Sequence, residues 1–218
     1  MREPGYGRPE ATARAVIYRF LSRAFLAPSP GIVRELREQV TEVDVSAQLL
    51  ETIGYRVWNS LEIALRGLPR SDSEIAQLRR EYAAIFLSTK PPLIREVAHV
   101  RGLEVDELET EYCEIGVTYD IPGLDPDHLS IELDYMHRLA LLEALAWKNA
   151  NPLPILEKEL AFLRRHLAAW VPRMARLAAA RARSDFYRGL STLLHHFIVR
   201  DVEIVALVAD MLSSLKRS

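Results

Sequence analysis

The stretch GLDPDHLSIELDYMHRL, residues 123–139, combines the apolar spacing of a helix with a dense group of ionisable side chains. Apolar residues recur along and just beyond it at intervals of three and four: Leu129, Leu133, Met136 and Ala140. This spacing predicts an amphipathic α-helix. Asp125 and Pro126 predict its start, because aspartate is a good N-cap and proline loses nothing at the first helical position.

The same spacing continues through most of the chain. Apolar stripes cover residues 17–25, 50–65, 75–86, 108–115, 156–170, 186–197 and 205–215. Ser71 and Ser184 stand where N-caps are expected, and Ser71 opens a capping box with Glu74. Pro172 predicts a bend or a restart within its helix. The sequence lacks a convincing strand pair and an internal repeat.

We therefore expect an all-α fold, a bundle of roughly eight to ten helices packed around one core. A single helical domain over residues 1–218 suits a chain of 218 residues. Residues 1–10 are expected to be flexible, and residues 88–102 are expected to form the longest irregular loop.

Composition narrows the class of protein. The net charge is −2, and the single cysteine excludes an internal disulfide and a multi-cysteine metal cage. The N-terminus has no uninterrupted apolar stretch that could serve as the core of a signal peptide. No segment approaches the roughly 18 apolar residues that a membrane span requires. We therefore expect a cytoplasmic, soluble protein.

The small net charge hides a strong asymmetry. Residues 102–137 contain 11 acids and no Lys or Arg, whereas residues 160–200 contain eight Arg and one acid. Opposite-sign blocks of this kind influence the choice of partner more than the fold. The alternative is that both blocks are solvated helix faces that partly neutralise each other.

His128 and Glu132 lie on one flank of the predicted helix, with Tyr135 beside them, because each residue advances about 100° around a helix. His137 lies on the opposite side, so one helix does not gather a three-ligand metal site. A metal-dependent hydrolase or an acid–base enzyme at His128 and Glu132 remains an alternative. No nucleophile elbow, phosphate loop or dinucleotide motif accompanies the pair. A plain His–carboxylate contact between helices is the simplest interpretation.

The acidic block favours a cationic partner. Glu107, Glu111 and Glu114 are spaced four and three residues apart, so they form one ridge of a helix. Like charges at this spacing destabilise a helix by a few tenths of a kcal/mol each, and no cation nearby in the sequence offsets the repulsion. Carboxylates beside apolar residues suit a peptide that carries both arginine and aliphatic side chains.

Several segments, in this order, resemble the TorD/DmsD/NarJ family of cytoplasmic chaperones for molybdenum-containing redox enzymes. They are EYAAIFL (81–87), the Pro91-Pro92 loop, LETEYCEIGVTYD (108–120), DPDHLSIELDYMHRLALLE (125–143), FLRRHLAAWVPRMARL (162–177) and DFYRGLSTLLHHFIVRD (185–201). The resemblance implies a helical chaperone, with no enzymatic activity and no cofactor or metal of its own. Such a protein binds the N-terminal leader, twin-arginine or similar, of a catalytic subunit and supports cofactor insertion before export or assembly.

The resemblance also implies a set of peptide-binding residues. The family's positions fall on Tyr82, Ile85, Phe86, Pro92, Leu93, Asp127 and His128, with Asp125 as a substitute for a family residue. The acidic ridge and the helix-face argument add Glu107, Glu111, Glu132 and Tyr135. A nucleic-acid-associated or regulatory protein that uses the basic block from Arg164 to Arg200 stays open as an alternative. The sequence leaves the client, the choice between monomer and homodimer, and nucleotide binding undetermined.

Overall fold

The computed structural model describes residues 6–42, 54–116 and 123–215, and within these ranges the protein is an all-α bundle, as predicted. The α-helices there are α1 (Arg8–Ala24), α2 (Pro30–Glu42), α4 (Tyr55–Arg66), α5 (Asp72–Phe86), α6 (Val105–Glu114), α7 (Leu129–Asn149), α8 (Leu153–Arg165), α9 (Leu167–Arg181) and α10 (Asp185–Leu215). A short 3-10 helix, η1 (Glu96–Ala98), lies in the loop between α5 and α6.

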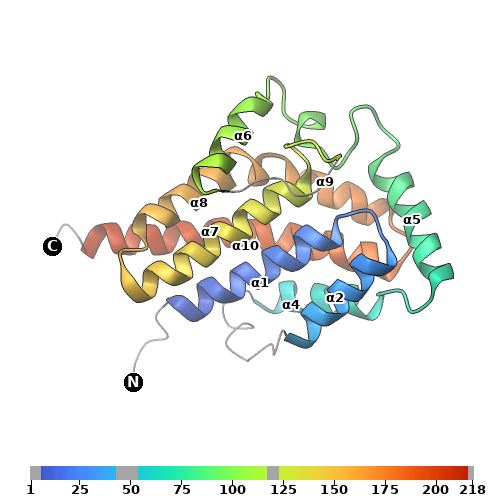
Figure 1. The fold of residues 1–218 in the computed structure, drawn as a ribbon, viewed down its shortest axis with the longest axis horizontal. Helices are drawn as coiled ribbons and strands as arrows, with labels where there is room; N and C mark the ends of the chain where they lie inside the picture. Colours follow the sequence, from blue (N-terminus) through green and yellow to red (C-terminus); the bar gives the residue numbers. More distant parts are fainter. Residues whose placement is uncertain (1–5, 43–53, 117–122, 216–218) are drawn as a thin grey trace.

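Two long helices organise the bundle. Figure 1 shows α7 and α10 running along the length of the molecule, with α1 beside α7. The helices α4, α8 and α9 pack against α10, and α5 lies at one end of the bundle. Fully buried aromatic side chains from seven helices fill the core between them: Tyr18, Phe86, Tyr112, Tyr135, Phe162, Trp170, Tyr187 and Phe197. The apolar stripes of the sequence therefore face one another, as the helical spacing requires.

The start of α7 differs from the prediction. The helix begins at Leu129 and its N-cap is His128, whose Nδ1 accepts a hydrogen bond from the Ser130 amide at 3.1 Å. An isolated antiparallel bridge pairs His128 with Arg95, and the residues from Asp125 to His128 form a turn closed by a hydrogen bond from the His128 amide to the Asp125 carbonyl at 2.9 Å. Asp125 and Pro126 are therefore not the cap and first residue of the helix, because this long-range bridge outweighs their local preference.

Two helix boundaries further along the chain also differ. The interruption expected near Pro172 lies at His166, which ends α8 and precedes α9, and Pro172 lies inside α9. The stripes at 186–197 and 205–215 belong to one helix of 31 residues, α10. No glycine or proline separates these two stripes, so nothing in the sequence ends the helix there.

The predicted serine caps are confirmed. Ser71 accepts a hydrogen bond from the Glu74 amide, and Ser184 accepts one from the Tyr187 amide at 3.2 Å. The Glu74 carboxylate accepts from the Arg70 amide, one residue before the position that a capping box would use. Local cap chemistry thus fixes the starts of α5 and α10.

Parts of the predicted pattern lie outside the described residues. Leu50 and Ile53, predicted to precede Val57 on one helical stripe, are among them, as are residues 1–5 of the expected flexible segment. Helix α1 already begins at Arg8, two residues before that segment was expected to end. In the described ranges, no helix combines the length and the apolar character that crossing a lipid bilayer would demand.

Candidate functional site

Arg95, in the loop after α5, joins two of the predicted binding residues. Its guanidinium lies 2.6 Å from an Asp125 oxygen and 2.7 Å from Asp127 Oδ1. Asp127 is fully buried, and its second carboxylate oxygen accepts a hydrogen bond from the Val97 amide at 3.1 Å. Asp125 keeps 56% of its side chain exposed. One arginine thus ties the irregular loop to the residues before α7, and Asp125 marks the outer edge of this contact.

The backbone reinforces the same junction. The Glu96 amide donates to the Asp127 carbonyl at 3.0 Å, and the Leu129 amide donates to the Ile94 carbonyl at 3.1 Å. Burial lowers the pKa of His128 to about 4, with the Arg95 charge acting in the same direction and Asp127 opposing both. His128 is therefore neutral at pH 7, which suits an imidazole nitrogen that accepts a hydrogen bond as a helix cap.

Behind this junction lies a second group of buried ionisable side chains. Glu132 and Glu96 are fully buried, and Glu132 accepts a hydrogen bond from Trp170 Nε1 at 3.3 Å. Burial, and then the charge of Glu96, raises the pKa of Glu132 well above its usual range. His166 Nδ1 lies 3.0 Å from Glu96. A proton on Glu132 and a charged His166 therefore limit the electrostatic cost of this cluster.

The acidic ridge on α6 receives cations from α8. Arg165 lies 3.0 Å from Glu111, and Lys158 lies 2.5 Å from Glu114. His166 Nε2 lies 3.7 Å from the same Glu111 oxygen. Glu107 is exposed to solvent. Tertiary contacts thus supply the neutralising charges that are absent nearby in the sequence, so the ridge is not a set of unpaired carboxylates.

The residues predicted on α5 and in the loop face largely inward. Tyr82, Ile85 and Phe86 are buried; Tyr82 donates a hydrogen bond to the Phe25 carbonyl, and the Phe86 ring centroid lies 5.7 Å from that of Tyr187. Leu93 is buried in the loop, and Pro92 is partly exposed. Tyr135 is buried on α7, with its ring 4.5 Å from that of Phe162.

The structure therefore brings the predicted residues together in two groups. One group joins the loop, α6 and the start of α7, and contains Glu111, Asp125, Asp127, His128, Glu132 and Tyr135. The other lies on α5 and packs into the aromatic core through Tyr82, Ile85 and Phe86. Glu111 and Asp125 form the accessible edge of the first group, Pro92 is partly exposed in the adjoining loop, and Glu107 extends the edge along α6.

Sequence reasoning missed the basic half of this site. Arg95, Arg165 and His166 contact the predicted carboxylates, while Glu96 and Trp170 complete the buried cluster. Arg95 stands in the irregular loop that the sequence singled out, which is a signal that could have identified it. His166 carries no comparable local signal, because its partners lie 55 and 70 residues away in the sequence (166 − 111 and 166 − 96).

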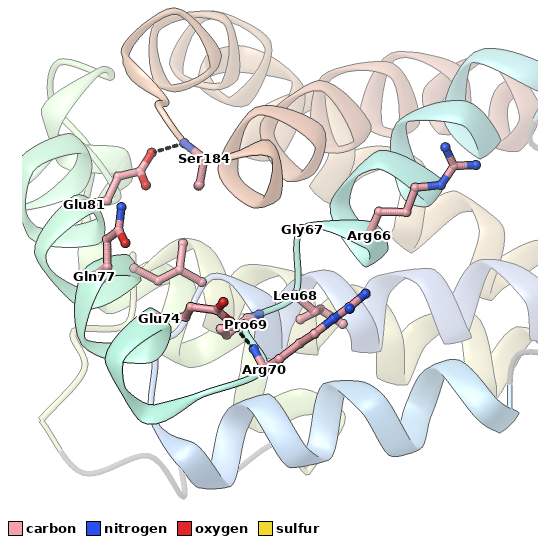
Figure 2. Close-up of a pocket in the computed structure, with 10 residues that line it drawn as sticks. Arg66, Gly67, Leu68, Pro69, Arg70, Glu74, Gln77, Glu81 and Ser184 are labelled. Atoms are coloured by element: carbon pink, nitrogen blue, oxygen red, sulfur yellow. Dashed lines mark hydrogen bonds between the residues drawn. The ribbon is translucent and has the colours of Figure 1, made fainter.

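Two solvent-accessible clefts flank α5. Figure 2 shows the first, a cavity of about 320 Å³ between the α4–α5 connection, α5 and Ser184, with Gln77 and Glu81 on its α5 side. The second, about 560 Å³, is named here the arginine cleft. It is lined by Gln77, Arg80, Glu81, Ala84, Ile85, Arg181 and Arg183. Ile85 is the only predicted binding residue that lines either of these two clefts.

Metal coordination was one alternative for His128 and Glu132. In the described ranges, no three His, Cys, Asp or Glu side chains come together in a way that could hold a metal ion. The His128 Nδ1 atom is occupied by the Ser130 amide, and the Glu132 carboxyl group faces Trp170. The geometry instead provides ion pairs around a loop and an accessible acidic edge.

Comparisons with known proteins agree on a family. Residues 47–176 match the family model described as nitrate reductase delta subunit. The perchlorate reductase assembly chaperone protein of Dechloromonas aromatica (strain RCB) is 28% identical, with 66% of this chain and 73% of that protein covered. The chaperone protein TorD of Aeromonas salmonicida (strain A449) is 26% identical, with 68% and 70% covered.

A solved structure shows the same fold. A crystal structure from Archaeoglobus fulgidus, described as a candidate redox enzyme maturation protein, matches with a TM-score of 0.54 over 91% of this chain and 98% of that chain. At 15% sequence identity this match concerns the fold alone. Because the family model spans residues 47–176, more than half of the chain, the protein belongs to the nitrate reductase delta subunit family.

Proposed function

We propose that this protein is a cytoplasmic assembly chaperone that binds the N-terminal leader of the catalytic subunit of a molybdenum-containing oxidoreductase. It would hold this subunit while the cofactor is inserted, before export or membrane assembly. The observation that carries the proposal is that the family-matched segment, residues 47–176, contains every predicted binding residue. The two chaperones named above support the same role.

The accessible acidic edge suggests how a leader would bind. Asp125 and Glu111 are paired with Arg95 and Arg165, so the protein's own guanidinium groups stand where the arginines of a leader would bind. Arg165 keeps 54% of its side chain exposed and Glu111 keeps 16%, so the ion pair is partly open to solvent and Arg165 exchanges for another cation at modest cost. A leader arginine would therefore replace Arg165 at Glu111, while the apolar part of the leader contacts the loop at Pro92.

Energetics permit such a site. A charge-assisted hydrogen bond to arginine contributes about 1.5–3 kcal/mol where it is partly desolvated. Burial of apolar surface adds roughly 25 cal/mol per Å². Micromolar affinity requires only about 8 kcal/mol in total.

The test is a calorimetric titration with a synthetic twin-arginine leader peptide. The double variant Asp125→Asn/Glu111→Gln is expected to weaken binding by roughly tenfold or more, because it removes two carboxylates from the edge. Arg165→Gln is expected to tighten binding, because it removes the guanidinium that competes for Glu111 and leaves His166 beside that carboxylate. The double variant Glu104→Gln/Glu109→Gln, which removes two exposed acids from the same acidic block, is the matched control and should bind nearly as the unchanged protein does.

Asp127 makes a less decisive target, because its carboxylate also holds the loop through Arg95 and the Val97 amide. Circular dichroism of each variant checks that the fold is intact. Equal affinity in the site variant and its control would reject the site. Purification of the tagged protein from its native cells tests the function separately, and the absence of any molybdenum enzyme subunit would reject the chaperone role.

A further inference from the structure

The arginine cleft has a positive charge that the leader site does not explain. Arg80, Arg181 and Arg183 are exposed and line it. None of their three guanidinium groups forms an ion pair with a carboxylate in the part of the chain that the structure describes. Three cations around one concavity repel one another, so this surface stabilises a bound anion.

Glu81 is the single acid among the described residues that line the cleft, and two backbone amides donate hydrogen bonds to its carboxylate. One of its carboxylate oxygens accepts hydrogen bonds from the amides of Arg183 and Ser184, at 2.6 Å and 2.9 Å. This contact fixes the α9–α10 connection against α5 and holds the backbone of Arg183 at the edge of the cleft. Asp185, the next acid along the chain, pairs with Arg188. The arginines of the cleft therefore stay available.

The cleft also has an apolar part. Ala84 and Ile85 contribute to its wall, and its volume of about 560 Å³ is sufficient for several side chains of a peptide. None of the described residues that line it has an aromatic side chain. Proteins that bind single-stranded nucleic acid rely on aromatic side chains to stack the bases, so this lining favours a peptide over an oligonucleotide.

We propose that the arginine cleft binds an acidic peptide segment of a protein partner, with carboxylates on Arg80, Arg181 and Arg183 and an aliphatic side chain against Ala84 and Ile85. This site is distinct in charge from the acidic edge at Asp125 and Glu111, which suits a cationic leader. The proposal therefore does not depend on leader binding.

The test uses fluorescence anisotropy with a labelled peptide of alternating glutamate and leucine. The triple variant Arg80→Gln/Arg181→Gln/Arg183→Gln is expected to weaken its binding by roughly tenfold or more, because it removes charge-assisted pairs. The triple variant Arg164→Gln/Arg173→Gln/Arg176→Gln removes the same charge from exposed positions outside the cleft, and should change the affinity by no more than about twofold if direct contacts dominate. Glu81→Gln keeps an oxygen acceptor for the two amides and should tighten binding.

A peptide with glutamine in place of glutamate is the ligand control and is expected not to bind. Equal losses in the two triple variants would overturn the proposal, because they would indicate non-specific charge attraction. Displacement of the peptide by millimolar inorganic phosphate would overturn it in favour of a small-anion site. Tighter binding of a single-stranded oligonucleotide to the same arginines would overturn it in favour of nucleic acid.

Discussion

Arg14 is buried among carboxylates from three other helices. Its Nη1 lies 2.5 Å from Glu143, its Nη2 lies 2.5 Å from Glu159, and its Nε lies 2.5 Å from Asp201. Tyr18 donates a further hydrogen bond to Asp201 at 2.6 Å. These side chains have no exposed surface, so α1, α7, α8 and α10 meet at one fully desolvated ionic cluster.

One arginine does not compensate three carboxylates in a dry interior. Burial raises the pKa of Glu159 to about 8, and the opposing charge of Arg14 only partly offsets this effect. Glu159 therefore carries a proton at neutral pH. Asp201 accepts two hydrogen bonds from Arg14 in addition to the one from Tyr18, whereas Glu159 accepts one from Arg14.

This difference predicts unequal costs for two isosteric variants. At pH 7, Asp201→Asn is expected to lower the free energy of unfolding by about 3 kcal/mol or more, because an amide nitrogen accepts no hydrogen bond and Arg14 then loses one of the two acceptors that Asp201 offers it inside the core. Glu159→Gln is expected to cost about 1 kcal/mol or less, because it replaces a neutral group with a neutral group. Urea denaturation measures both, and equal costs would contradict the assignment of the proton to Glu159.

The sequence contains one indication that Arg14 is buried beside a partner. It lies between Ala11, Ala15 and Tyr18 on the buried face of α1, where a charged side chain requires a partner. The identity of that partner does not follow from the sequence, because Glu143 and Asp201 lie 129 and 187 residues away.

Helices α4 and α10 approach each other unusually closely at Gly189. A Cβ atom at this position would meet the Ala64 backbone nitrogen closer than real Cβ contacts allow. Gly67 has a similar contact with the Phe186 backbone, so two glycines allow this helix pair to pack backbone against backbone. Gly189 lies inside the continuous helix α10 although glycine has a low helix propensity, which indicates that the close packing outweighs this cost.

Gly189→Ala is therefore expected to lower the free energy of unfolding by about 1–3 kcal/mol, since backbone atoms have no room to move aside. Gly31→Ala, in the first turn of α2, is the matched control. Its added Cβ would meet only Ser29 Oγ, at 3.8 Å, so it should be neutral or slightly stabilising. Thermal unfolding followed by circular dichroism measures both, and an unchanged midpoint for Gly189→Ala would contradict the close approach of α4 and α10.

Helix caps and apolar stripes predicted the starts of helices correctly where no contact from a distant part of the chain competed with them. The Ser71 and Ser184 caps and the apolar stripes located α5 and α10 correctly at their starts. The start of α7 was wrong because the bridge between Arg95 and His128 competes with the cap at Asp125. The break at His166 was missed because the ring is anchored between Glu96 and Glu111, neither of which is near it in the sequence.

For the whole molecule, buried ionisable groups determine how stability depends on pH. Burial alone would lower the pKa of His166, but the hydrogen bonds and charges of Glu111 and Glu96 raise it to about 9. Glu159 titrates at about 8. Both values exceed the usual ones, so between pH 6.5 and 9 the folded protein holds more protons than the unfolded chain.

The free energy of unfolding should therefore fall as pH rises from about 6.5 to about 9, by about 4 kcal/mol. Below about pH 6.5, two histidines act in the opposite direction. Burial lowers the pKa of His128 and His137, so the folded protein holds fewer protons at these two groups than the unfolded chain does. Urea denaturation across pH 6–9.5 tests the prediction. The double variant His166→Gln/Glu159→Gln should flatten the profile, and a flat profile in the unchanged protein would contradict it.

The sequence by itself determined the all-α class, the caps at Ser71 and Ser184, and the segregation of acids and arginines into separate blocks. Each of these depends on spacing or composition within a short window, where helix periodicity and side-chain to backbone hydrogen bonds act. Only the tertiary structure decided which charges neutralise one another. Asp127 pairs with Arg95, Glu111 with Arg165, and Arg14 with three buried acids, because packing brings together side chains that are 32 to 187 residues apart.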